Sequence, residues 1–220
     1  MRKLAIGMVV LFALVIGADR LADFIAERAV GDTLQTSQQL AARPDVDIAG
    51  FPFLTQLIAS HFDKITVTAH DVPLGDSRLS LRVSQISAVL RDVKVDFSLD
   101  KATIGRGTAF ALITYGALSK TLGLDVAYAG NGQLKLGKAV TIAGQTINPS
   151  VTVSPKLVQG SLAFGAGTVP PTVQYLQSVL GVRLSLDRIP FGLTLQSVSA
   201  NNSGVFVELS GSNVTLKKPG

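Results

Sequence analysis

Two histidines and a scatter of aspartates are the side chains in this sequence that could support acid–base or metal chemistry. His61 and His70 are nine residues apart, and no acidic cluster with metal-ligand spacing surrounds them. His70 and Asp71 are neighbours on a predicted strand, where adjacent side chains point to opposite faces. We therefore predict that both histidines are surface residues and that the chain has no metal site.

Nucleophile and nucleotide-binding motifs are also missing from the sequence. It has no Gly-x-Ser-x-Gly elbow, no Walker loop and no dinucleotide fingerprint, since Gly105-Arg106-Gly107 is too short for one. It has no cysteine, which excludes disulfides and Cys-based metal sites. The aspartates at 63, 71, 76, 92, 96 and 100 are scattered, and sequence distance alone pairs none of them. We predict no catalytic residues, no cofactor and no enzymatic activity.

The composition is unusually apolar for a chain without a long hydrophobic stretch. Of 220 residues, 47% are hydrophobic and 16% charged, against about 25% charged in typical soluble domains, and the mean hydropathy is +0.40. After residue 18, no apolar run reaches the length of about 20 residues that is needed to span a bilayer. Two interpretations stay open: an ordinary β-rich domain with low surface charge, or apolar surface that faces a lipid-filled cavity.

The net charge is mildly positive. The formal charge is +5, and without residues 1–18 it is +3, from 18 basic and 15 acidic residues. This excess is too small for a nucleic-acid-binding protein. It is compatible with work beside anionic lipid headgroups.

The N-terminus has the pattern of an export signal. Arg2 and Lys3 precede the apolar run Leu4–Ala18, which ends in the small-residue site Ile16-Gly17-Ala18. The run is short for a spanning helix, but helical spacing continues through Asp19–Leu40, so an uncleaved membrane anchor is the alternative. We predict an exported protein, with residues 1–18 as signal peptide or anchor and residues 19–220 as a single domain.

The segment after residue 18 has an amphipathic helical pattern. Its apolar stripe contains Leu21, Phe24, Ile25, Ala29 and Leu34, whereas Asp23, Glu27, Arg28 and Asp32 lie off that stripe.

The stretch Ile48–Val72 combines a stiff turn, a short helix and a strand. Pro52 fixes its own φ and favours an extended Phe51, so we expect both Phe51 and Phe53 to be held rigidly and to face inward. Residues 53–60 are predicted as a short helix with Leu54, Leu57 and Ile58 on one face. Residues 62–69 alternate like a strand.

Short strands joined by turns make up most of the remaining chain. Helices are predicted at 108–122 and 172–180, and hairpin turns at Gly130-Asn131-Gly132 and Asn201–Gly204. A phase change near Gln85 and Ile86 indicates a bulge or bend in a long strand. Hairpins imply antiparallel pairing, so the sequence predicts an antiparallel, strand-dominated fold.

Three segments resemble a known family. The residues GFPFLTQL and HFDKITVTAHDV, and the closing IPFGLTLQSVSANNSGVFVELSGSNVTL, resemble the LmeA-like family of actinobacterial cell-envelope lipid-binding proteins. The resemblance implies an α+β fold of the tubular, bactericidal/permeability-increasing type, with a long twisted antiparallel sheet rolled around one or two helices. It also implies that residues 19–220 are a lipid-binding domain in the cell envelope or periplasmic space. The implied ligand is phospholipid, with phosphatidylinositol as the named candidate, and the implied role is support of envelope lipoglycan or mannan maturation at the membrane surface.

An apolar groove could bind lipid without specific polar recognition, since each buried methylene contributes about 0.8 kcal/mol. We predict as lipid-binding residues Phe51, Phe53, Leu54, Leu57, Phe110, Ile113, Leu118, Leu176, Leu180 and Phe191, each of which could equally be plain core. Candidate headgroup contacts are Lys64, Arg82, Arg91 and Lys94, which could equally be solvated strand residues.

Two alternative functions remain. The first is a scaffold with a closed core and no ligand, which would hold envelope biosynthetic enzymes. The second is an enzyme acting on envelope glycolipid, which would need carboxylates or a nucleophile that converge in a cleft.

Overall fold

The computed structural model describes residues 2–74, 81–96, 101–142, 145–159, 161–166, 183–185 and 192–217. The helices are α1 (Arg2–Ser37), α2 (Phe53–Ala59) and α3 (Tyr115–Leu122). The strands are β1 (Asp45–Ala49), β2 (His61–Leu74), β3 (Leu81–Val95), β4 (Lys101–Ile113), β5 (Asp125–Gly130), β6 (Gln133–Gly137), β7 (Val140–Ile142), β8 (Gln145–Ile147), β9 (Ser150–Val158), β10 (Ser161–Ala166), β11 (Arg183–Ser185), β12 (Thr194–Asn201) and β13 (Gly204–Lys217).

These strands form two larger sheets and one hairpin. A six-stranded sheet has the order β1-β2-β3-β4-β13-β12, a five-stranded sheet has the order β11-β10-β9-β6-β5, and β7 pairs with β8. The pairs β1–β2, β5–β6, β9–β10 and β12–β13 are antiparallel. The predicted α+β fold, dominated by a long antiparallel sheet with a few helices, is confirmed.

The chain divides into two compact units. Unit 1 contains Met1–Ala69, Ser87–Gly107 and Gly211–Gly220, and unit 2 contains His70–Ile86 and Thr108–Ser210. Strands β2, β3, β4 and β13 each contribute residues to both units. The single domain proposed for residues 19–220, and the boundary at residue 18, stay predictions.

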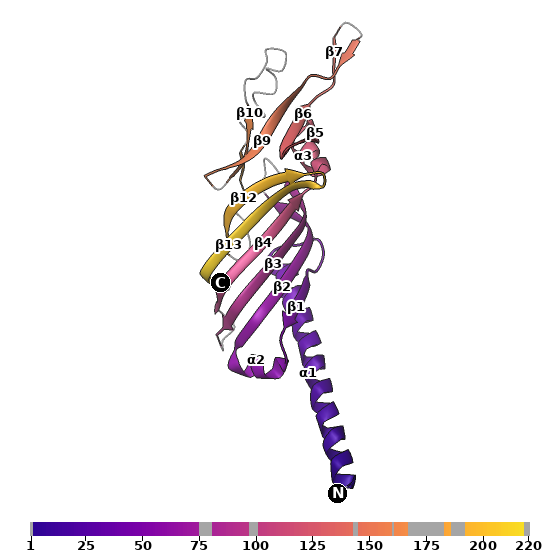
Figure 1. Cartoon of the computed structure of the whole chain (residues 1–220), viewed down its shortest axis with the longest axis vertical. Helices are drawn as coiled ribbons and strands as arrows, with labels where there is room; N and C mark the ends of the chain where they lie inside the picture. The colour runs from indigo at the N-terminus through magenta and orange to yellow at the C-terminus, as the bar shows by residue number, and fades with distance from the viewer. Residues whose placement is uncertain are drawn as a thin grey trace. The chain divides into compact units, whose positions relative to one another are not determined.

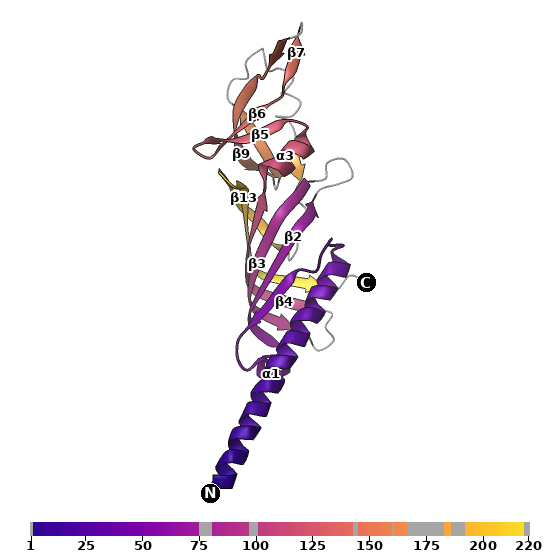
Figure 2. The same ribbon diagram turned by 90° about the vertical axis from the view of Figure 1, so that its right-hand side faces the viewer.

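In unit 1, helix α1 packs on the edge strand β1. Strand β1 pairs with β2 so that Val46 lies opposite Val67 and Ile48 opposite Ile65. The core beneath these strands contains Ile48, Phe53, Phe62 and Val67, with the Phe53 and Phe62 ring centroids 6.2 Å apart. Figures 1 and 2 show α1 running beside β1, while its first turns extend past the other elements of unit 1.

Unit 2 contains the two predicted hairpins. Gly130, Asn131 and Gly132 all have positive φ at the β5–β6 turn, as a tight hairpin requires. The β12–β13 hairpin turns at Asn201–Gly204, and the Tyr115 hydroxyl donates to the carbonyl oxygens of Asn201 and Gly204. These hydrogen bonds hold the hairpin against the start of α3.

Strand β3 has the predicted change of phase. Its buried positions are odd-numbered at Leu81 and Val83 but even-numbered at Ile86, Ala88 and Leu90. The side-chain alternation therefore shifts by one residue near Gln85, as expected for a bulge in a long strand.

The predicted helix at residues 108–122 is wrong over its first half. Residues 108–113 belong to β4, where Ala109, Ala111 and Ile113 are buried and Phe110 between them is exposed. This period of two is that of a strand. The helix begins after Thr114, whose hydroxyl accepts a hydrogen bond from the Ala117 N–H as an N-cap. The helix predicted at 172–180 lies outside the described residues.

Candidate functional site

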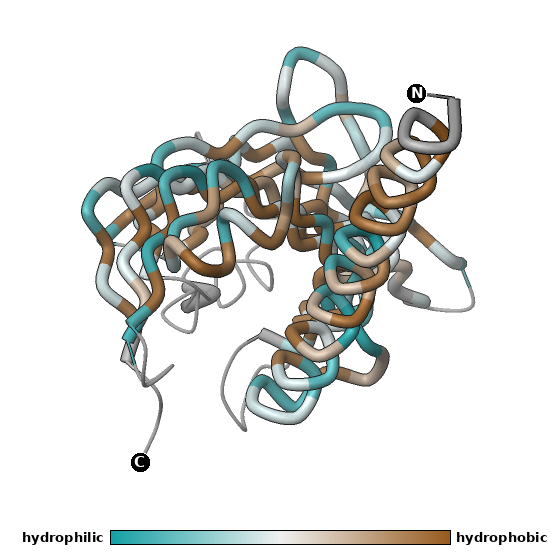
Figure 3. Tube along the Cα trace, turned by 90° about the horizontal axis from the view of Figure 1, so that it is seen from below, coloured by the Kyte–Doolittle hydropathy of each residue, from teal (hydrophilic) through white to brown (hydrophobic). Residues whose placement is uncertain are grey.

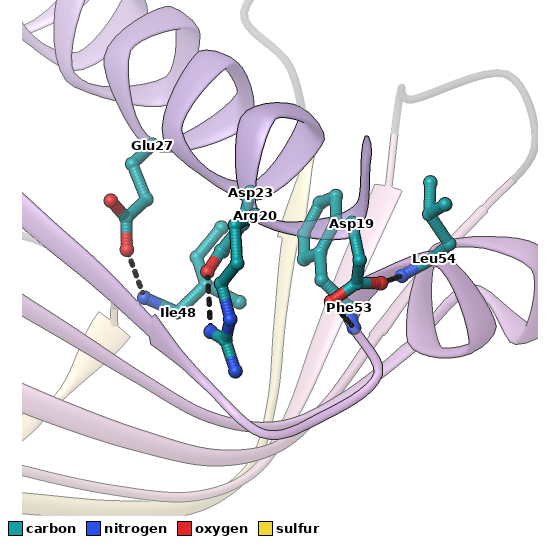
Figure 4. A network of polar contacts seen from close by, with 7 residues as sticks. All are labelled: Asp19, Arg20, Asp23, Glu27, Ile48, Phe53 and Leu54. Carbon is teal, nitrogen blue, oxygen red and sulfur yellow. Dashed lines mark hydrogen bonds and ion pairs between the residues drawn. The ribbon is translucent and has the colours of Figure 1, made fainter. Parts of the chain in front are cut away.

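Within unit 1, helix α1 packs on β1 and α2 through an acidic stripe. Asp19, Asp23 and Glu27 follow one another at i, i+4 and i+8, so they share one helix face. Asp19 is only 1% exposed and Asp23 only 8% exposed. Figure 4 shows these side chains on the side of α1 that faces β1 and α2.

Asp19 supplies the N-terminal cap of α2 from a different helix. The Phe53 N–H donates to its Oδ2 at 3.1 Å and the Leu54 N–H donates to its Oδ1 at 2.8 Å. The residue at the N-cap position, Pro52, makes no side-chain cap bond. Because the first N–H groups of a helix need external acceptors, the Asp19 carboxylate joins α2 to α1. The Phe51-Pro52 peptide bond before the helix is cis.

Glu27 makes the second backbone contact of the stripe. Its Oε1 accepts a hydrogen bond from the Ile48 N–H at 2.9 Å. Since β1 is the edge strand of its sheet, this bond covers part of an otherwise open edge.

Asp23 lies between these two contacts, and its carboxylate has fewer hydrogen bonds than that of Asp19. Arg20 Nη1 is 3.4 Å from its Oδ2, and its Oδ1 has no hydrogen-bond partner in the described part of the chain. Burial raises the pKa of the Asp23 carboxyl above 3.8, and the nearby Arg20 opposes that rise. Ionisation of Asp23 is therefore less favourable in the folded chain than in the unfolded chain.

The apolar stripe of α1 is exposed, although an amphipathic helix ordinarily buries that stripe. Leu21 and Ile25 lie on the opposite side of the helix from Asp23, Phe24 lies on the flank between the two sides, and all three are exposed. The large apolar residues between Ile6 and Val15 are exposed as well, and Figure 3 shows these turns in brown. In the part of the chain that the structure describes, no helix is long and apolar enough to cross a membrane.

Helix α2 has the same inverted arrangement. Leu57 is 48% exposed and Ile58 is 78% exposed, whereas Phe53 and the polar Gln56 are buried. Gln56 Oε1 accepts a hydrogen bond from the Asp63 N–H at 3.0 Å, and its side-chain amide nitrogen has no partner within the described ranges. The fold thus buries an amide and leaves two aliphatic side chains open.

Arginines accompany the exposed rings of this surface. The Arg20 guanidinium carbon is 5.0 Å from the Phe51 ring centroid, and that of Arg28 is 4.6 Å from the Phe24 ring centroid. Both distances are within the range of cation–π attraction. The surface therefore presents aromatic and aliphatic groups beside positive charge.

The structure places the predicted lipid-binding residues in different environments. Phe51, Phe53, Leu54 and Leu57 come together at α2 in unit 1, while unit 2 holds Phe110, Ile113 and Leu118. Phe53, Ile113 and Leu118 are buried, Leu54 is half-buried, and Phe51, Leu57 and Phe110 are exposed. The expectation that Phe51 faces inward is wrong, since its ring is 57% exposed. Leu176, Leu180 and Phe191 lie outside the described residues.

The predicted headgroup contacts are mainly surface residues. Arg82, Arg91 and Lys94 are exposed, Lys64 is half-buried, and Arg82 forms an ion pair with Asp71. His61 Nε2 lies 3.9 Å from Asp92 Oδ1, and His70 is exposed. Across the described ranges, no three potential ligand side chains are grouped so that they could hold a metal ion.

Sequence reasoning missed the residues that build this corner of unit 1: Asp19, Arg20, Asp23, Glu27 and Gln56. Two signals pointed to them. Acidic residues recur at helical spacing directly after the apolar run, and the N-cap position of α2 holds a proline without a side-chain acceptor.

Comparison with known proteins identifies the family. No curated protein and no solved structure was found to match the chain. A family model described as LmeA-like phospholipid-binding matches residues 17–210, which include the acidic stripe of α1, all of β12 and residues 204–210 of β13. The chain therefore belongs to the LmeA-like phospholipid-binding family.

Proposed function

We propose that this protein is an exported cell-envelope protein that binds phospholipid in an apolar groove and has no catalytic role. The observation that carries the proposal is the inverted packing of α1 and α2, which bury carboxylates and an amide while their apolar faces stay open. Such apolar faces suit acyl chains as ligands. Contact between a face and an acyl chain removes apolar surface from water and needs no polar recognition.

The ligand class is supported by the family and by the charges on the same surface. The family is named for phospholipid binding. Arg20 and Arg28 lie over exposed rings of unit 1, where guanidinium groups could pair with lipid phosphates. We propose phosphatidylinositol as the lipid and support of lipoglycan or mannan maturation as the role, with envelope biosynthetic enzymes as possible partners.

The proposed acyl-chain contacts are taken from each unit separately. In unit 1 they are Phe53 and Leu54, and in unit 2 they are Phe110, Ile113 and Leu118. Leu176, Leu180 and Phe191 belong to the same proposal. Phe51 and Leu57 belong to the open side of α2, and a different role is argued for them below.

The N-terminal segment supports the proposed location. Arg2 and Lys3 precede an apolar run, as in export signals, and that run continues without interruption into the helix that holds Asp19. As a cleaved signal or as a retained anchor, this segment would bring the protein to the outer side of the plasma membrane.

Native mass spectrometry of the full chain, purified in mild detergent, tests the proposal. We expect a bound mass equal to one or more phospholipids, and exchange for phosphatidylinositol when the chain is incubated with vesicles that contain it. Phosphatidylcholine vesicles serve as the comparison for headgroup preference. A chain that neither carries nor takes up phospholipid would reject lipid binding and favour the closed-core scaffold.

A further inference from the structure

We propose that the exposed face of α2, formed by Leu57 and Ile58 and bordered by Phe51, inserts into the surface of a bilayer that contains anionic phospholipid. This α2 face would hold unit 1 against the membrane. The inference rests on the membrane location proposed above, but it does not depend on which lipid the protein carries.

The first argument is the orientation of α2. A seven-residue helix could bury its aliphatic side chains by a rotation about its axis, yet Phe53 and Gln56 occupy the buried side. Gly50 makes this orientation possible, because its backbone, at φ +126°, lies directly against the Gln56 amide with no room for a Cβ. The fold therefore holds Leu57 and Ile58 outward by a built contact.

The second argument is the position of α2 along α1. The apolar run ends at Ala18, and the next residue, Asp19, binds the backbone of Phe53 and Leu54. Helix α2 thus lies at the level where the apolar turns of α1 leave the other elements of unit 1 (Figure 1). A membrane that receives those turns would place its headgroup region at this level. All residues of the α2 face follow residue 18, so cleavage of the run would leave them in the chain.

The third argument is that a basic side chain lies beside the exposed Phe51 ring. Arg20 stacks on Phe51, so one contact joins an aromatic ring and a guanidinium at the rim of the α2 face. Aromatic rings beside basic side chains are typical of membrane–water interfaces, where the ring meets the acyl boundary and the charge meets phosphate. This pairing favours an anionic bilayer as the occupant.

A second protein is a poorer occupant for this face. Even fully buried, an aromatic side chain contributes about 150–250 Å², so three partly exposed side chains offer a few hundred Å² at most. A stable protein interface needs about 800 Å² from each partner. Insertion into a fluid bilayer needs no such complementary area.

The sequence has no cysteine, so one engineered thiol gives a unique label. We would attach an environment-sensitive dye to Ile58→Cys of the full chain, with Gln38→Cys as control, because Gln38 is exposed beyond the opposite end of α1. With vesicles of phosphatidylglycerol and phosphatidylcholine, the dye at 58 should shift to the blue and be quenched by nitroxide-bearing lipid. The dye at 38 should stay in water. A dye at 58 that also stays in water on vesicle-bound protein would overturn the inference.

A paired variant measures how much the α2 face contributes. Leu57→Ser/Ile58→Ser in the full chain should weaken vesicle partitioning roughly 10- to 100-fold, since it removes two exposed aliphatic groups. Ile147→Ser is the matched control, because Ile147 in β8 is 48% exposed, the same as Leu57. Equal partitioning of the paired variant and the control would also overturn the inference.

Mass spectrometry of the same samples separates the two proposals. A chain that carries phospholipid but keeps the dye at 58 in water refutes the α2 face alone. If the dye enters the bilayer but the chain carries no phospholipid, membrane insertion of the α2 face is supported and phospholipid binding in a groove is refuted.

Discussion

Replacing Asp19 by alanine should detach the start of α2 from α1. The carboxylate is 1% exposed and accepts two backbone N–H groups, from Phe53 and Leu54. In the variant, both donors would lose their acceptor in a site from which water is largely excluded. The local structure of unit 1 must then open, or the two N–H groups must stay unpaired.

The expected cost follows from these two bonds. A hydrogen bond to a charged group contributes about 1.5–3 kcal/mol to stability, and loss of a helix cap costs about 0.5–2 kcal/mol. Because the cap and the bonds are the same contacts, they are not added twice. We expect Asp19→Ala to lower the free energy of unfolding by about 2–4 kcal/mol. Asp19→Asn, which keeps one acceptor oxygen, should lose roughly half as much.

Urea unfolding followed by circular dichroism, with the full chain in mild detergent, measures the global effect. Asp32→Ala is the matched control, because Asp32 lies on the same helix, is 65% exposed and pairs with Arg43 at 3.5 Å. A surface ion pair of this kind contributes about 0–1 kcal/mol. Amide hydrogen exchange measures the local effect. The Leu54 N–H should lose protection, whereas the Leu118 N–H, bonded to the Thr114 carbonyl in unit 2, should keep it.

The reasoning would be refuted by an Asp19→Ala protein that unfolds like Asp32→Ala and whose Leu54 amide exchanges at the wild-type rate. That result would mean that water replaces the carboxylate at no cost.

Three further predictions concern the same corner of unit 1. Gly50→Ala should cost about 1–3 kcal/mol in thermal unfolding, because φ is +126° and a Cβ would lie 2.9 Å from Gln56 Cδ; a wild-type melting temperature would contradict this. Asp23→Asn should stabilise the chain more at pH 7 than at pH 3. Burial raises the Asp23 pKa above 3.8, so the wild type loses stability as pH rises through the raised pKa, and asparagine does not ionise; an equal difference at both pH values would argue against it. Phe53→Ala should cost about 3–5 kcal/mol as a core truncation, whereas Phe51→Ala should cost less than about 1.5 kcal/mol because its ring is exposed; equal losses would show that the two rings have similar environments.

Local signals in the sequence were enough for much of the fold. The glycine-rich turn at Gly130–Gly132 requires positive φ, so it identified the β5–β6 hairpin directly. The phase change near Gln85 was visible because strand alternation depends only on neighbouring residues. The helical spacing after residue 18 likewise belongs to α1. Residues 108–113 were misread because Ala109–Ile113 is apolar at every position, and such a run fits a helix and a strand equally well.

The apolar N-terminal run, the stiff turn at Gly50–Phe53 and the strand-dominated class were all predictable from the order of the residues. Each follows from backbone preferences and side-chain periodicity over a few residues. The buried faces of α1 and α2 were not predictable in this way. That choice depends on a contact across 34 residues, in which Asp19 accepts the free N–H of Phe53. Periodicity shows that a helix has an apolar face and a polar face. Which face is buried depends on hydrogen bonds to residues that are distant in the sequence.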